Sequence, residues 1–270
     1  MLKGDRPLET QRNLTREMLN KVPAVTLAFW VIKIMATTVG ETAADFLIFN
    51  IGLGLVMTSL IMGALLLIVL FYQLRLREYV PTSYWLVVVL VSIVGTLVSD
   101  YLVDDLGISL VTTTILFGSG LAAVFAAWYA SEKTLSIHSI FTTKRELFYW
   151  AAILFTFALG TSAGDLVAES VGLGYGTSAV IFGALIAFVY LGYRLGVGAV
   201  LAFWVAYILT RPFGASMGDL LSQPVGNGGL GLGTTGTSAL FLVTIAGLVT
   251  YLTITRADRI KTSQVVEVDA

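Results

Sequence analysis

The sequence predicts an all-α membrane protein whose eight transmembrane helices form four parallel two-helix repeats, packed as a pseudo-fourfold or a pseudo-twofold bundle. Three observations lead to this prediction. The 270 residues are 57% hydrophobic and 12% charged, with a mean hydropathy of +0.87, whereas soluble domains carry roughly 25% charged residues. Apolar stretches of about 20 residues, which are long enough to cross a bilayer, recur along the chain. One sequence motif occurs four times.

The composition excludes several classes of protein. A chain with so few charges cannot build a water-soluble surface, which excludes an ordinary soluble enzyme, and its hydrophobicity excludes a disordered chain. Its net charge of −1 provides no basic field, so no nucleic-acid partner is expected. Because the chain has no cysteine, it cannot form disulfides, thiolate metal sites or a cysteine nucleophile.

Eight spans are expected in order along the chain, at 24–46, 52–73, 84–103, 109–130, 147–168, 175–193, 196–220 and 237–255. The links after the first, third, fifth and seventh spans are short or rich in glycine, whereas Lys or Arg follows each of the others. The spans are grouped into repeats at about 24–78, 79–143, 144–197 and 198–255. These make up a membrane domain of residues 23–255, between an N-terminal segment 1–22 and a C-terminal tail 256–270.

The basic residues predict the orientation of the bundle. Of the 16 Lys and Arg residues, 14 lie before the first span or after an even-numbered span, and the opposite links contain none. By the positive-inside rule, both termini are expected in the cytoplasm, and the protein is expected to be a multi-pass protein of the bacterial inner membrane. The two remaining basic residues, Lys33 and Arg211, fall inside spans.

Each repeat carries the motif W-x9-G-x4-D-x6-G. The four copies are Trp30, Gly40, Asp45 and Gly52; Trp85, Gly95, Asp100 and Gly107; Trp150, Gly160, Asp165 and Gly172; and Trp204, Gly214, Asp219 and Gly226. Four fixed positions in four copies indicate an internal repeat. Because each repeat holds two spans, successive repeats enter the membrane in the same orientation and are related by an axis near the membrane normal.

With these motifs, the chain resembles a family of bacterial membrane proteins that contain four tandem repeats of unknown function. Each repeat of that family has two spans and a characteristic tryptophan, and its members are often labelled uncharacterised membrane-anchored proteins. The resemblance covers residues 24–255. It implies the repeat architecture and very little about activity.

Nearly every ionisable residue within the spans lies on one stripe of an odd-numbered span. Side chains four residues apart share one face of a helix. The stripes are Lys33, Thr37, Glu41 and Asp45; Ser92, Thr96, Asp100 and Asp104; Thr161, Asp165 and Glu169; and Tyr207, Arg211, Ala215, Asp219 and Gln223. Since charged side chains in a membrane face the protein interior or a water-filled cavity, the odd-numbered spans are predicted to line the centre of the bundle.

The balance of charge on these stripes favours cation transport. Five acids (Glu41, Asp45, Asp100, Asp165 and Asp219) face two bases (Lys33 and Arg211) in the predicted membrane interior. An uncompensated excess of negative charge is costly there, so protons, water or a bound cation must neutralise it. Carboxylate ligands without cysteine favour a hard divalent cation such as Mg²⁺, Ca²⁺ or Mn²⁺. The favoured function is therefore a membrane transporter of a small inorganic cation, such as a divalent metal exporter coupled to protons.

This hypothesis assigns a role to each charged residue. The four aspartates are the proposed metal ligands, Glu41 adds a carboxylate or carries the proton, and Lys33 and Arg211 occupy carboxylates when the cation leaves. Thr37, Thr96, Thr161, Glu169 and Asp104 form a secondary polar stripe. Because the two bases belong to the first and fourth repeats, the acid–base chemistry is expected between the first and seventh spans. The expected partners are the lipid bilayer, the cation, protons and a second copy of the chain, with no covalent cofactor.

Other interpretations are open at this stage. A non-transporting scaffold or sensor subunit is the main alternative. An intramembrane enzyme acting on lipid is less favoured because no nucleophile–base pair is visible, so no enzymatic activity is expected. Each aspartate could instead cap a helix or loop, and the first glycine of each motif could serve close helix packing as readily as a helix break near a site. Lys33 could extend to the interface, and the tryptophans are expected to be interfacial anchors.

Overall fold

The structure is a computed structural model that describes residues 20–258. Almost all of the expected N-terminal segment 1–22 and most of the tail 256–270 lie outside these residues. Eight helices of 19 to 24 residues make up most of the described chain, which contains no strand. They are α2 (Leu27–Asp45), α3 (Leu55–Arg75), α4 (Pro81–Asp100), α5 (Leu110–Glu132), α6 (Thr143–Asp165), α7 (Gly174–Arg194), α8 (Ala199–Ser222) and α9 (Gly233–Thr255). The predicted all-α class is confirmed.

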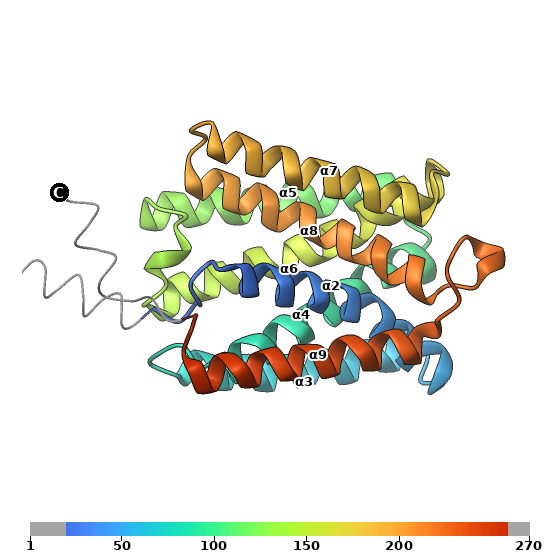
Figure 1. The fold of residues 1–270 in the computed structure, drawn as a ribbon, viewed down its shortest axis with the longest axis horizontal. Coiled ribbons are helices and arrows are strands. Elements are labelled where there is room, and N and C mark those ends of the chain that lie inside the picture. Colours follow the sequence, from blue (N-terminus) through green and yellow to red (C-terminus); the bar gives the residue numbers. More distant parts are fainter. Residues whose placement is uncertain (1–19, 259–270) are drawn as a thin grey trace, which may run out of the picture.

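The helices form an inner ring of four and an outer layer of four (Figure 1). In the inner ring, α2 packs against α4, α4 against α6, α6 against α8, and α8 back against α2. Each outer helix packs on the inner helix of the following repeat: α3 on α4, α5 on α6, α7 on α8, and α9 on α2. The first and last repeats are therefore neighbours, as the pseudo-fourfold arrangement requires.

The surface of this bundle suits a lipid environment. Within residues 20–258, seven helical segments are long and apolar enough to cross a membrane; α2, which carries Lys33 and Glu41, is not among them. The outer helices expose large apolar side chains, among them Leu60 on α3, Ile115 on α5 and Phe188 on α7. Such a continuous apolar exterior is typical of helices that face lipid tails. The chain is thus a multi-pass membrane protein.

The first glycine of each motif lets neighbouring inner helices approach closely. A Cβ atom added at Gly40, Gly95, Gly160 or Gly214 would come within 3.0 Å of a side chain on the next helix of the ring. The residues met are Ser92, Phe157, Arg211 and Thr37, respectively, and each lies eight residues before the motif aspartate of its own repeat. All four helices continue through these glycines. Close packing is therefore the role of the glycines, and the alternative of a helix break is wrong.

Three of the four motif tryptophans are packed inside the protein. Trp85, Trp150 and Trp204 are 2–4% exposed, and Trp30 is half-buried. The indole of Trp204 donates a hydrogen bond to the carbonyl oxygen of Leu135 at 2.9 Å. The expectation that the tryptophans are interfacial anchors is wrong for these three, because packing against other parts of the protein buries their side chains.

An aromatic layer packs within the inner ring, near the end at which its four helices begin. It consists of the aromatic residue that precedes each tryptophan: Phe29, Tyr84, Tyr149 and Phe203. The rings of Phe29 and Phe203 lie 6.0 Å apart, and the hydroxyl groups of Tyr84 and Tyr149 form a hydrogen bond. This end of the bundle axis is therefore closed by packed side chains.

Candidate functional site

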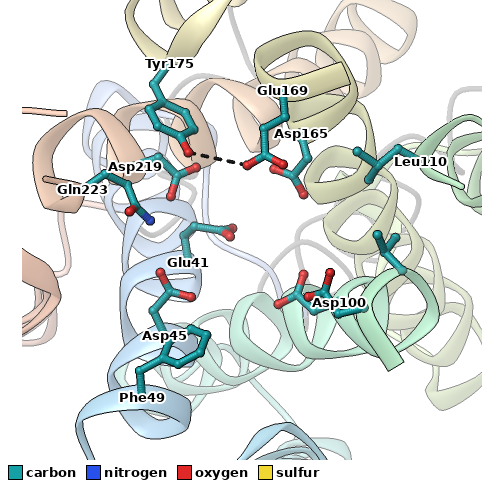
Figure 2. Close-up of a pocket in the computed structure, with 12 residues that line it drawn as sticks. Glu41, Asp45, Phe49, Asp100, Leu110, Asp165, Glu169, Tyr175, Asp219 and Gln223 are labelled. Atoms are coloured by element: carbon teal, nitrogen blue, oxygen red, sulfur yellow. Dashed lines mark hydrogen bonds between the residues drawn. The ribbon is translucent and has the colours of Figure 1, made fainter. Parts of the chain in front are cut away.

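Acidic residues surround a cavity of about 250 Å³ at the opposite end of the inner ring. Seven carboxylates line it: Glu41, Asp45, Asp100, Asp104, Asp165, Glu169 and Asp219. They are seven of the 17 acidic residues in the whole chain, so the negative charge is concentrated here. The volume is sufficient for several water molecules. Figure 2 shows carboxylates from all four inner helices around one central space.

The cavity deepens from an exposed rim to a buried floor. Asp104 and Glu169, each four residues after a motif aspartate, are exposed at the rim. Asp45, Asp100 and Asp165 are half-buried, whereas Asp219 is 8% exposed. Glu41, at 7% exposed, lies four residues before Asp45 and therefore one turn deeper. The four-residue periodicity of the sequence thus correctly predicted that these acids face the centre of the bundle.

The backbone changes its winding directly after three of the motif aspartates. Short π-helical segments follow at Phe46–Asn50, Tyr101–Asp105 and Leu166–Ser170. Each contains a hydrogen bond between residues five apart, such as Ile51 N–H to the carbonyl oxygen of Phe46 at 3.0 Å. None of the three aspartates that precede these segments makes a side-chain capping bond. The capping alternative is therefore wrong for Asp45, Asp100 and Asp165.

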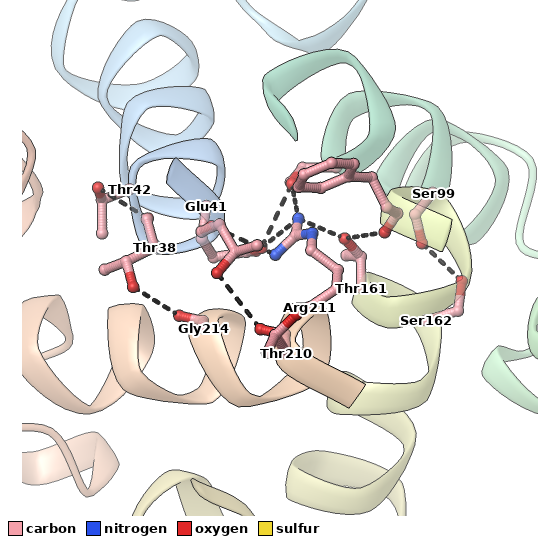
Figure 3. A network of polar contacts seen from close by, with 12 residues as sticks. Thr38, Glu41, Thr42, Ser99, Thr161, Ser162, Thr210, Arg211 and Gly214 are labelled. Atoms are coloured by element: carbon pink, nitrogen blue, oxygen red, sulfur yellow. Dashed lines mark hydrogen bonds and ion pairs between the residues drawn. The ribbon is translucent and has the colours of Figure 1, made fainter. Parts of the chain in front are cut away.

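Arg211 is fully buried behind Glu41, the deepest carboxylate of the cavity floor, and does not itself line the cavity. Its Nη2 atom donates to Glu41 Oε2 at 3.2 Å, to Thr161 Oγ1 at 2.7 Å and to Thr96 Oγ1. Its Nη1 atom donates to the carbonyl oxygen of Thr37 at 3.4 Å. Figure 3 shows the guanidinium of Arg211 held between Glu41 and Thr161. The expected ion pair of Arg211 is present, and it joins α8 to α2, the two inner helices that close the ring.

Four consecutive segments of the chain match the family model described as Repeat of Unknown Function (DUF347), at residues 28–79, 83–134, 148–196 and 202–258. The chain belongs to this family. The resemblance to a family with four tandem repeats of unknown function is confirmed, and each matched segment contains one inner and one outer helix. In the comparisons with curated proteins and with solved structures, nothing matched the chain.

The DUF347 repeats contribute unequally to the floor. Four residues before the motif aspartate, the first three repeats carry Glu41, Thr96 and Thr161, and the fourth carries Ala215. Arg211 comes from the fourth repeat, and its Nη2 atom bonds to the residues at this position in the other three. The four repeats have a similar fold, but only the fourth places a cationic side chain, that of Arg211, among these positions.

Lys33 lies deeper than Arg211, on α2 of the first DUF347 repeat. Its side chain is fully buried. The ammonium donates to the carbonyl oxygen of Tyr207 at 2.9 Å and to the hydroxyl of Thr210, and it lies 4.3 Å from the ring centre of Tyr207. Within residues 20–258, Lys33 forms no ion pair. Neither the expected pairing with a carboxylate nor extension to the interface is seen.

Sequence reasoning missed the residues that complete the rim. Phe49 lies on a π-helical segment, and Tyr175 lies on the outer helix α7. The hydroxyl of Tyr175 donates to Glu169 Oε1 at 3.5 Å. Phe49 lies four residues after Asp45 and continues the stripe of α2 by one more turn. The four-residue spacing of the stripe could therefore have identified it. No sequence signal placed Tyr175 here, because the even-numbered spans carried no polar stripe.

The carboxylates surround the cavity rather than converge on one point. Among the residues that the structure describes, no group of three or more Asp, Glu or His side chains is close enough to hold a metal ion directly. The four motif aspartates come from four different helices. This spacing fits a cation that keeps part of its water shell, as Mg²⁺ commonly does in proteins.

Proposed function

We propose that this protein transports a small inorganic cation across a membrane through the acidic cavity. The observation that carries the proposal is the grouping of seven carboxylates around one cavity, the deepest of which, Glu41, is paired with the buried Arg211. Burying so many carboxylates together is costly unless protons or cations neutralise them. Ionisable residues at membrane depth mark ion pathways in many membrane proteins.

All eight long helices span the bilayer in this proposal, including the more polar α2, which the other helices shield from lipid. The protein is placed in a bacterial inner membrane with both termini in the cytoplasm, since 14 basic residues belong to that side. The cavity then opens to the exterior, and the aromatic layer of Phe29, Tyr84, Tyr149 and Phe203 closes the cytoplasmic side. This arrangement corresponds to one of the two states that an alternating-access carrier requires.

The cargo is a hard divalent cation, bound by the carboxylates of Asp45, Asp100, Asp165 and Asp219 directly or through water. Glu41 provides the deepest carboxylate. In the absence of the cation, the guanidinium of Arg211 compensates the charge of Glu41 at 3.2 Å. A cation that reaches the floor competes with Arg211 for this carboxylate. The competition would let the site release its cargo without leaving Glu41 unpaired.

Cation flux in proteoliposomes tests the proposal. We expect Asp45→Asn and Asp165→Asn each to lower the uptake of Mn²⁺ or Mg²⁺ by about tenfold or more, because a lost charge-assisted contact is worth about 1.5–3 kcal/mol. Asp105→Asn is the matched control: Asp105 is exposed and adjoins Asp104, but it does not line the cavity. This control should transport at the wild-type rate.

Wild-type flux in both cavity variants would remove the proposed mechanism. If the wild-type protein moved no cation of the panel Mg²⁺, Mn²⁺, Ca²⁺, Na⁺ and K⁺, transport itself would be refuted. Copurification with a second membrane subunit would then favour the scaffold or sensor alternative.

A further inference from the structure

We infer that Lys33 is the proton-carrying residue that couples cation movement to proton movement in the opposite direction. The inference rests on the proposed transport function and adds to it the identity of the coupling group. It is drawn from the surroundings of Lys33 and from the contacts that connect this residue to the cavity floor.

Among the residues that the structure describes, no anion compensates the charge of Lys33. Its ammonium is fully buried, and its bonds go to two neutral oxygens, one on Tyr207 and one on Thr210. By contrast, Lys21, the other buried lysine of the described chain, lies 2.7 Å from Glu146. A buried cation without a counter-ion is costly. A lysine, unlike an arginine, can respond by releasing its proton.

A continuous series of contacts joins Lys33 to the floor of the cavity. Arg211, which is paired with Glu41, donates to the carbonyl oxygen of Thr37 at 3.4 Å. The hydroxyl of Thr37 donates to the carbonyl oxygen of Thr210 at 3.4 Å, and the hydroxyl of Thr210 accepts from Lys33. Both cationic side chains also lie over the ring of Phe157, whose centre is 5.2 Å from Lys33 Nζ and 5.5 Å from the guanidinium carbon of Arg211.

This geometry provides a mechanism of coupling. When a cation binds to the carboxylate of Glu41, the guanidinium of Arg211 loses its counter-ion. Its positive charge is then uncompensated and close to that of Lys33. The repulsion between the two cations then favours loss of the Lys33 proton: one N–H bond breaks, the amine keeps the electron pair, and the proton leaves on water. The divalent cation brings two positive charges into the site, and the proton removes one of them. When the cation departs, Arg211 returns to Glu41, and Lys33 can be protonated again.

The other titratable groups around Lys33 do not take this role. Its own helix α2 provides Glu41, which is paired; α8 provides Arg211 and Tyr207; α6 and α4 provide Tyr149 and Tyr84. The outer helix α9 provides Tyr251, which is 55% exposed. The arginine does not release its proton in proteins, and tyrosines ordinarily titrate near pH 10.

Buried tyrosine hydroxyl groups lie between Lys33 and the closed end of the axis. The hydroxyl of Tyr207 is buried, and no described residue forms a hydrogen bond with it. One layer further, the hydroxyls of Tyr84 and Tyr149 bond to each other. Hydroxyl groups at these positions can pass a proton between water molecules through a core that is too tightly packed for a metal cation.

The test compares Lys33→Met and Lys33→Arg with the wild type in proteoliposomes that contain a pH-sensitive dye. Two quantities are measured: proton movement driven by a cation gradient, and counterflow of labelled Mn²⁺ with the same cation on both sides. We expect both variants to lose proton movement and to keep counterflow above that of empty liposomes. Lys144→Met is the matched control, because this lysine is exposed, and it should retain both. Size-exclusion profiles and melting curves verify that each variant is folded.

The outcomes separate this inference from the function on which it rests. Cation-driven proton movement that persists in Lys33→Met refutes the role of Lys33 and leaves cation transport intact. Loss of counterflow together with proton movement shows a structural role for Lys33 and also refutes the inference. A wild-type protein that moves cations without protons refutes the coupling, and one that moves no cation refutes both proposals.

Discussion

At the scale of single residues, one substitution in one repeat creates the asymmetry of the site. The position eight residues before the motif aspartate holds Thr37, Ser92 and Phe157 in the first three repeats and Arg211 in the fourth. The long side chain of Arg211 reaches over Ala215, the smallest residue of its layer, to the carboxylate of Glu41. The hydroxyls of Thr96 and Thr161, which accept from the same Nη2 atom, support this buried ion pair.

Removal of Arg211 should destabilise the protein more than removal of the whole ion pair. In Arg211→Met, the carboxylate of Glu41 is left buried without its partner, a loss that typically costs about 3–5 kcal/mol. Addition of Glu41→Gln should recover much of this loss. The apparent melting temperature in detergent measures both variants, and Arg194→Met, at an exposed arginine, should behave like the wild type. If Glu41→Gln lowered the melting temperature further when added to Arg211→Met, the two residues would not act as a pair.

The residues that the sequence predicted correctly are those governed by helical periodicity. The spacing of four placed Glu41 and Asp45 on one face, and the structure brings both into the cavity. The same geometry argues against a pair of Lys33 and Glu41, because eight residues along a helix separate them by about 12 Å. The partners of Lys33 and Arg211 lie on other helices, and no spacing within one helix could identify them. The burial of the tryptophans likewise depends on tertiary packing.

At the scale of helices, the first glycine of each motif allows neighbouring inner helices to approach each other closely. Each first glycine admits a side chain from the next helix of the ring, so the glycine of one repeat and the residue it meets belong to different repeats. The π-helical segments after three aspartates could not be predicted, because no sequence pattern distinguishes them from α-helix. The fourth copy also differs: Gly52, Gly107 and Gly172 have positive φ, whereas Gly226 does not. In the last repeat, positive φ occurs instead at the later glycines Gly228, Gly231 and Gly233.

Substitution of a ring glycine should loosen the bundle. A Cβ at Gly95 would lie 2.6 Å from Phe157 Cβ, which is too close to its backbone to move aside. We expect Gly95→Ala to cost about 1–3 kcal/mol, the usual penalty for overpacking. Gly63→Ala, on the outer helix α3 with no atom within 4 Å of the added Cβ, should be neutral or slightly stabilising. Thermal unfolding in detergent measures both variants. A melting temperature lower for Gly63→Ala than for Gly95→Ala would contradict close packing at the ring glycines.

At the scale of the whole molecule, the four repeats close into a ring in which every outer helix is carried by the next repeat. The sequence predicted four parallel units from the motif and the alternation of spans. It could not decide between fourfold and twofold packing, because that choice depends on contacts between units. The decisive contact is the one between the last outer helix, α9, and the first inner helix, α2. There, the hydroxyl of Ser238 bonds to that of Thr42 at 2.7 Å.

Closure of the ring can be tested directly, since the chain contains no cysteine and an introduced pair is unique. Oxidation of Thr42→Cys/Ser238→Cys should form a disulfide within one chain, detected by mass spectrometry as two joined peptides under non-reducing conditions. Thr42→Cys/Thr250→Cys is the control, because residue 250 is exposed and lies 12 residues, or about 18 Å, further along α9. A disulfide between two chains would show that α9 packs on a second copy, and the site would then be completed only in an oligomer. Arg211 and Glu41 also meet at the contact between the first and last repeats. A change that opens the ring at this contact should therefore also break the ion pair between Arg211 and Glu41.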